Sequence, residues 1–285
     1  MHRLTAVAFS LLPLSCLADG SAWLPEPETG TVNLSYVFQT SDEFYRADKK
    51  VSTPGGGEAI DQHTVWLNLN YALQDDLAFD LQVGYAKSDF MTGAGIPTTD
   101  ESFSGLADVN FGLTWRVVDE LISEYNLPSI AFRVGAILAG HYETGYINSL
   151  GDGGSGREAS LIIGKVFADQ IALSGEFGYR RRNHNIPDDA FINLSASYLF
   201  NSKLSASLEY KWNDARSGLD IGGPGFSPAK FPELEEDYQI VGLGLSYNVT
   251  DELNLGLALA TTVDGRNAND TNAIGLTVGY AFETF

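Results

Sequence analysis

Residues 238–260, YQIVGLGLSYNVTDELNLGLALA, alternate large apolar side chains with small or polar ones. Leu243 and Leu245 lie in the first half, residues 250–252 interrupt the alternation, and Leu255 and Leu257 continue it. The pattern predicts two antiparallel strands that share one apolar face. The other face lacks the large aliphatic side chains that fill the core of a soluble barrel. We therefore expect the apolar face to contact lipid and the small, polar face to line a lumen.

The same alternation recurs in twelve segments between Thr31 and the C-terminus. One of them, residues 159–167, is almost entirely apolar, so its facing cannot be assigned from the sequence. The connections alternate in length. Short turns are expected at residues 74–76, 168–170, 201–203 and 250–252, with a longer one at 119–128. Long loops are expected at residues 46–62, 88–104, 140–158, 181–190, 213–237 and 263–272. This arrangement predicts an all-β, antiparallel, up-and-down transmembrane β-barrel of about 12 strands, with short periplasmic turns and long extracellular loops.

Aromatic residues gather near both expected membrane interfaces. Trp115, Tyr198 and Tyr280 are among those near the short turns, and Tyr85 and Trp212 are among those near the long loops. Such rings combine an apolar body with a polar tip, which suits an interface. A soluble β-sandwich would explain any single hairpin, but it does not explain twelve hairpin-forming segments with segregated loop lengths. The terminal Phe285 is typical of proteins that the outer-membrane assembly machinery recognises.

The N-terminus indicates export. A short basic end, an apolar stretch and small residues before Ala18 predict a signal peptide over residues 1–18. Cys16 raises the alternative of lipoprotein processing, which Pro13 disfavours. We expect residues 19–30 to form a periplasmic lead-in, with Trp23 packed in the barrel mouth, and residues 31–285 to form the barrel.

Composition limits the other classes. The 285-residue chain has 44% hydrophobic residues, 37 Asp and Glu against 17 Lys and Arg, and a mean hydropathy of -0.07. Beyond the N-terminus it has no apolar run of the roughly 18 residues that a transmembrane helix needs. The acidity argues against nucleic-acid binding. The one cysteine lies in the predicted signal peptide, so no disulfide framework is expected.

Polar side chains on the expected inner faces are the candidate permeation residues. They are Asp80, Gln82, Asp108, Asn110, Arg116, Arg133, Glu176, Arg180, Glu209 and Lys211, with Asn193 and Asn248 among them. Their mixed charges have two interpretations: ion pairs that fill a narrow barrel, or a constriction that selects permeants by charge and shape. Many inner glycines favour an open interior only weakly, because glycine also eases strand curvature.

Catalytic and metal-binding chemistry finds little support. A barrel hydrolase would need a histidine and a serine on one strand face, and His63, His141 and His184 all lie near loops without a serine two residues away. No Cys/His cluster suggests zinc, and residues 151–156 and 267–272 lack the spacing of a calcium loop. We expect no catalytic site, metal or cofactor. Arg180, Arg181 and Arg182 either form a solvated rim or contact lipopolysaccharide phosphates.

The segments GLADVNFGLTWR (residues 105–116) and LPSIAFRVGA (residues 127–136), with the Gly-rich loop up to Gly156, carry a family resemblance. They resemble the outer-membrane transporter family associated with a MetA pathway of phenol degradation, which is related to fatty-acid-channel barrels. The resemblance implies a channel for a hydrophobic or aromatic compound and supplies no catalytic or binding residues. The long plug of the fatty-acid channels has no counterpart in residues 19–30.

We therefore expect a passive channel in the outer membrane of a Gram-negative bacterium, for a small, aromatic or weakly hydrophobic permeant. Its partners would be membrane lipid, lipopolysaccharide and the assembly machinery, and an apolar belt without a polar seam predicts a monomer. Two alternatives stay open: a structural or adhesive barrel with a filled lumen, and a lipid-modifying enzyme.

Overall fold

The computed structural model describes residues 20–90 and 101–284. The predicted signal peptide, Phe285 and the middle of the predicted loop 88–104 lie outside the described residues. In the described part of the chain, no helix has the length and hydrophobicity that crossing a bilayer requires.

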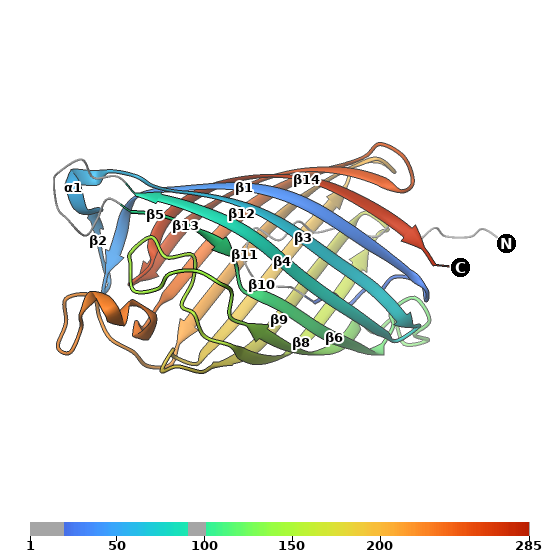
Figure 1. Cartoon of the computed structure of the whole chain (residues 1–285). Helices are drawn as coiled ribbons and strands as arrows, with labels where there is room; N and C mark the ends of the chain where they lie inside the picture. The colour runs from blue at the N-terminus through green and yellow to red at the C-terminus, as the bar shows by residue number, and fades with distance from the viewer. Residues whose placement is uncertain (1–19, 91–100, 285) are drawn as a thin grey trace.

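The chain forms one antiparallel sheet that closes on itself (Figure 1). In chain order the elements are β1 (Thr29–Arg46), β2 (Lys49–Ser52), α1 (Pro54–Gly57), β3 (Ile60–Gln74), β4 (Leu77–Phe90), β5 (Glu101–Leu106), β6 (Val109–Val118), β7 (Ser129–Leu138), β8 (Gly156–Phe167), β9 (Ile171–Arg182), β10 (Asp189–Leu199), β11 (Leu204–Ala215), a 3-10 helix (Pro228–Glu233), β12 (Asp237–Asn248), β13 (Leu253–Arg266) and β14 (Asn269–Glu283).

These fourteen strand segments make a twelve-stranded barrel. β5 and β6 both pair with β4, one above the other, and so form a single strand with a break at residues 107–108. β2 pairs only with the outer end of β1 and extends it beyond the barrel wall. β14 pairs with β1 over fourteen registered positions and closes the ring. The predicted fold and strand number are confirmed.

The faces of the strands follow the predicted alternation. Leu243, Leu245 and Leu255 are exposed on the outside, whereas Gly242 and Gly256 point inwards and are buried. The outside of the barrel is therefore an apolar belt, which is the arrangement that lipid contact requires. We call the space enclosed by the inner faces the lumen.

β8 contains the segment whose facing the sequence left open. Glu158, Ser160, Ile162 and Gly164 point inwards, and Leu161 and Ile163 point outwards. Ile162 is fully buried although it faces the lumen, because it packs against Ala22 and Ala131. The inner face therefore contains an apolar residue that packs against other apolar side chains, which explains why the alternation is lost in this segment.

The two ends of the barrel differ. The short turns, the start of β1 and the end of β14 lie at one end, which we call the turn end (Figure 1). The long connections and α1 lie at the other, the loop end. β13 and β14 continue to Arg266 and Asn269, so the predicted loop 263–272 is mostly strand. Strands of 14 to 18 residues, as in β1, β13 and β14, exceed the roughly 9–11 residues that cross a membrane, so part of the wall stands above it.

Candidate functional site

The inner face has two chemically different sides. On β12, β13, β14 and β1, the inward residues are mostly small and uncharged, among them Gly244, Ala258, Thr277 and Ser35. On β4 and from β7 to β11, the inward residues include carboxylates, arginines and a lysine. The two sides of the inner face therefore differ in both side-chain size and charge.

Arg133 on β7 occupies the centre of the charged side and is 1% exposed. Its Nε donates to Asp80 Oδ2 at 3.0 Å, and its Nη2 donates to Asp80 Oδ1 at 2.6 Å. Its Nη1 pairs with Glu158. The two-point contact with Asp80 fits the planar fork of the guanidinium to one carboxylate and fixes the arginine in place.

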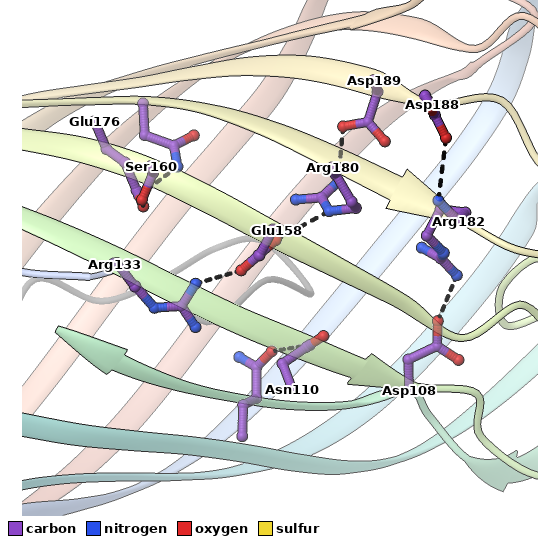
Figure 2. A network of polar contacts seen from close by, with 12 residues as sticks. Asp108, Asn110, Arg133, Glu158, Ser160, Glu176, Arg180, Arg182, Asp188 and Asp189 are labelled. Carbon is purple, nitrogen blue, oxygen red and sulfur yellow. Dashed lines mark hydrogen bonds and ion pairs between the residues drawn. The ribbon is translucent and has the colours of Figure 1, made fainter.

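Arg180 on β9 continues the network towards the loop end (Figure 2). It donates from Nε to Glu158 Oε2 at 3.1 Å and from Nη1 to Asp189 Oδ1 at 3.0 Å. The guanidinium carbon lies 5.0 Å from the centroid of the Phe191 ring, within the range of a cation–π contact. Glu158 therefore bridges the two arginines, and charges on five strands, β4 and β7 to β10, are joined in one chain.

Neutral polar groups extend the charged network on both sides. Glu176 accepts hydrogen bonds from Ser160 Oγ at 2.6 Å and from Asn193 Nδ2 at 3.1 Å. Nearer β4, Asn110 donates to Gln82 at 3.1 Å, and Gln82 donates to Asn68 at 2.9 Å (Figure 2 labels Asn110). These contacts fix the inner side chains in one arrangement.

Asp108 lies at the break between β5 and β6 and holds a long connection against the wall. Arg182 Nη2 donates to it at 2.9 Å, and the backbone N–H of Gly140 donates at 3.0 Å. Tyr142 donates its hydroxyl to the same carboxylate. The break leaves Asp108 outside the strand ladder, which frees it to anchor residues 139–155 at the loop end.

The connections at the loop end contact one another. We call residues 139–155 and 216–236, with the turns at residues 47–48 and 267–268, the cap. The ring of Phe103 on β5 lies 4.6 Å from that of Tyr146, so residues 139–155 also pack against this strand. Asn267 joins three connections: its side chain accepts from the backbone N–H of Ala47 and Ile221 and donates to Asp220. These contacts join the connections at the loop end to one another and to the barrel wall.

Two half-buried carboxylates lie in the cap, Asp152 and Glu236, and neither forms a salt bridge with the residues that the structure describes. Burial, with added repulsion from Asp152 and Asp189, raises the pKa of Glu236 to about 8. Burial raises the pKa of Asp152 to about 6, although the positive charge of Arg182 partly opposes the increase. Neighbouring negative charges thus add to the effect of burial at Glu236, whereas at Asp152 the largest charge contribution is the attraction of Arg182.

At the turn end, the N-terminal segment enters the lumen. Trp23 donates from Nε1 to Glu120 Oε1 at 2.7 Å, and its indole lies against Gly164, where a Cβ would approach the ring to 2.7 Å. Gly20 lies against Ile162 and Arg133, where a Cβ would clash with both side chains. Residues 20–23 therefore reach from the turn end to the level of Arg133 and narrow the lumen there.

The sequence-predicted candidates lie in four places. Asp80, Gln82, Asn110, Arg133, Glu176 and Arg180 come together in the networks above, with Asn193 joined to Glu176. Glu209 and Lys211 are buried on the inner face of β11, and Asn248 lies near the turn end of β12. Arg116 also lies at the turn end, where it pairs with Asp119 at 3.0 Å and with the carbonyl of Asp75. Asp108 serves the cap rather than the middle of the lumen.

Sequence reasoning missed Glu158, Asp189, Asp152 and Glu236, because all four fell inside or at the edge of segments predicted as loops. Glu158 lies two residues before Ser160, so the two side chains face the same side of the strand. Starting the predicted strand one residue earlier would have placed Glu158 beside Ser160 on that face. Among the described residues, no group of three or more His, Cys, Asp or Glu side chains is arranged to hold a metal ion. His63 lies among outward residues, against the hydroxyl of Tyr36 at 2.7 Å.

The comparisons with known proteins agree with this architecture. Residues 32–279 match the family described as "Putative MetA-pathway of phenol degradation". The chain belongs to this family. The family match spans the barrel from the first strand to the last, so membership concerns the whole fold rather than a local motif. A search of curated proteins gave no sequence match.

Solved structures of outer-membrane channels and porins share the fold of this chain. The COG4313 outer membrane channel from Pseudomonas putida F1 is 15% identical, with a TM-score of 0.71, over 93% of this chain and 100% of that one. The NanC porin is 6% identical, with a TM-score of 0.54, over 89% and 100%. The KdgM porin is 8% identical, with a TM-score of 0.52, over 88% and 99%. At such low identities the likeness establishes the fold alone.

Proposed function

We propose that the protein is a channel for passive passage of a small, aromatic or weakly hydrophobic compound across the outer membrane of a Gram-negative bacterium. The observation that carries the proposal is the two-sided lumen: a wall of small residues faces a fixed polar network inside a closed apolar barrel. Membership in the family and the outer-membrane channels of the same fold support it.

The orientation follows from the same proposal. Residues 1–18 would be removed as a signal peptide, the turn end would face the periplasm and the loop end the cell exterior. Lipid and lipopolysaccharide would surround the belt, with Arg181 exposed near its upper edge. The assembly machinery would insert the barrel, which would work as a monomer without catalytic activity.

One observation favours a second candidate, a structural barrel with a filled lumen. Residues 20–23 and the cap both narrow the passage, and the arginines are bound to carboxylates. A filled barrel and a channel make different predictions for ionic current.

The test is planar-bilayer recording of the refolded protein, with small aromatic compounds added to one chamber. A channel for such compounds gives discrete conductance steps that a subset of the aromatics blocks in a concentration-dependent manner. Steps without blockade by any aromatic would contradict the assigned permeant class. A folded barrel without steps would favour the filled lumen.

A further inference from the structure

The ionisable side chains of the inner face are unequal in number. The carboxylates on the inner face or at its loop-end rim are Asp80, Asp108, Glu158, Glu176, Asp189 and Glu209; the cations are Arg133, Arg180, Arg182 and Lys211. At the turn end, Arg116 pairs with Asp119, and this pair leaves the excess of carboxylates unchanged. The opposite wall, on β12 to β14 and β1, contributes no charged residue inside the barrel along its small-residue stretches in the described chain. No cation there offsets the excess of carboxylates.

The arginines are also electrostatically committed. Arg133 binds two carboxylates, Arg180 binds two, and Arg182 binds Asp108. A cation held between two carboxylates has little attraction left for a passing anion, because the field that the anion meets is the sum of all three charges. The arginines therefore do not make the lumen anion-attracting.

The cap adds Asp152 and Glu236, which have no salt-bridge partner in the described chain. Both belong to connections at the loop end, and Asp189 and Arg182 lie close to both. Burial is the main cause of the raised pKa of both groups; repulsion from Asp189 adds to each, and at Asp152 the attraction of Arg182 is larger than either repulsive contribution.

We infer that the lumen admits cations and neutral molecules in preference to anions, and that Asp152 and Glu236 set this preference at the entrance. The inference rests on the proposed channel function. Charges act over a Debye length of about 10 Å in 0.1 M salt, which is comparable with the radius of a twelve-stranded barrel. Fixed carboxylates in so narrow a space concentrate cations and deplete anions along the whole path.

The inference assigns the permeant a chemical class. A small aromatic amine or an uncharged phenol would pass, whereas an aromatic carboxylate of the same size would be repelled at the cap. The rigid network around Arg133 would then exclude molecules by size, because its side chains are held by hydrogen bonds on several strands.

The experiment is the reversal potential of the full-length mature protein in a planar bilayer under a potassium chloride gradient at pH 8.5, where both cap groups are mainly ionised. We expect a potential of the sign that potassium permeation produces. The variant Asp152→Asn/Glu236→Gln should bring the potassium-to-chloride permeability ratio closer to one. Asp264→Asn, an exposed carboxylate hydrogen-bonded to Gln239, is the matched control and should leave the ratio unchanged.

The possible failures are distinct. Conductance with chloride preference, or a ratio that the double variant leaves unchanged while it folds like the parent, would overturn the inference and leave the channel function intact. A folded barrel without conductance would overturn the proposed function and the inference with it. A change of the same size in Asp264→Asn would also overturn the role of the cap, because surface charge in general would then explain the selectivity.

Discussion

Replacing Arg133 by methionine tests the structural weight of the inner network. The substitution preserves most of the side-chain length and removes the charge. Asp80 then loses its one ionic partner among the described residues, and it is 6% exposed, whereas Glu158 keeps Arg180. Removing one member of a buried pair leaves an uncompensated charge, which typically costs about 3–5 kcal/mol of folding free energy.

The assay is urea unfolding of the barrel in lipid vesicles, followed by tryptophan fluorescence, since the chain has 4 tryptophans. We expect Arg133→Met to lower the unfolding midpoint clearly. The double variant Asp80→Asn/Arg133→Met should recover most of the loss, because both partners of the pair are then neutral.

Arg181→Met is the matched control. Arg181 pairs with Asp188 at 3.3 Å, but its side chain is 62% exposed, so the same chemical change should cost less than about 1 kcal/mol. Equal midpoints for Arg133→Met and the wild-type protein, or a double variant less stable than the single one, would refute the claim that Arg133 is a buried structural ion-pair partner.

Three further predictions concern the two entrances to the lumen. Trp23→Ala should raise single-channel conductance, because residues 20–23 lose their contacts with Glu120 and Gly164, whereas Trp23→Phe keeps a ring and should have a smaller effect. Unchanged conductance in Trp23→Ala would show that the segment does not narrow the path. Asp108→Ala should speed proteolysis between residues 139 and 155, measured by mass spectrometry of the fragments, because the loop loses contacts with Gly140 and Tyr142; protection equal to the wild type would contradict this. Cation preference should rise with pH from about 5 to 9, because Asp152 and then Glu236 lose their protons, in the neighbourhood of Asp189, Asp237 and Arg182. Glu236→Gln should remove the step near pH 8, and a flat profile in the wild type would contradict the assignment.

The fold could be predicted because the outward face has a strict chemical requirement. A lipid-facing position must be apolar and an inward one need not be, so alternations such as Leu243, Leu245 and Leu255 identify both strand and facing. The requirement weakens where an inward residue has an apolar partner. Ile162 points inwards against Ala22, and that contact spans residues far apart in sequence, which a strand pattern does not encode.

The site could be predicted only in part for a similar reason. The alternation of side chains along each strand placed Asp80, Arg133 and Arg180 on the inner face. It carried no information on which of these side chains contact one another. Their pairing depends on the stagger of neighbouring strands, seen in the register of β7 with β8 and of β8 with β9. Glu158, the bridge between the two arginines, was assigned to a loop because its strand continues beyond the expected membrane span.

The N-terminal segment and the cap were the least predictable parts. Residues 20–23 have no periodicity, and their place in the lumen depends on an indole fitting over one glycine and bonding one carboxylate. The cap depends on a break in a strand at residues 107–108, which lets Asp108 bind groups from two other segments. Both are tertiary contacts that local sequence patterns do not specify.

The central claim is that solutes pass through the lumen along the neutral wall. The most direct measurement is single-channel recording of Ala260→Cys in the mature chain, which would otherwise have no cysteine if residues 1–18 are removed. Ala260 is half-buried and lies on the inner face of β13. We predict discrete conductance steps that fall when a bulky, water-soluble thiol reagent modifies this cysteine. Steps that persist unchanged after complete modification, or a folded barrel that never conducts, would contradict the account.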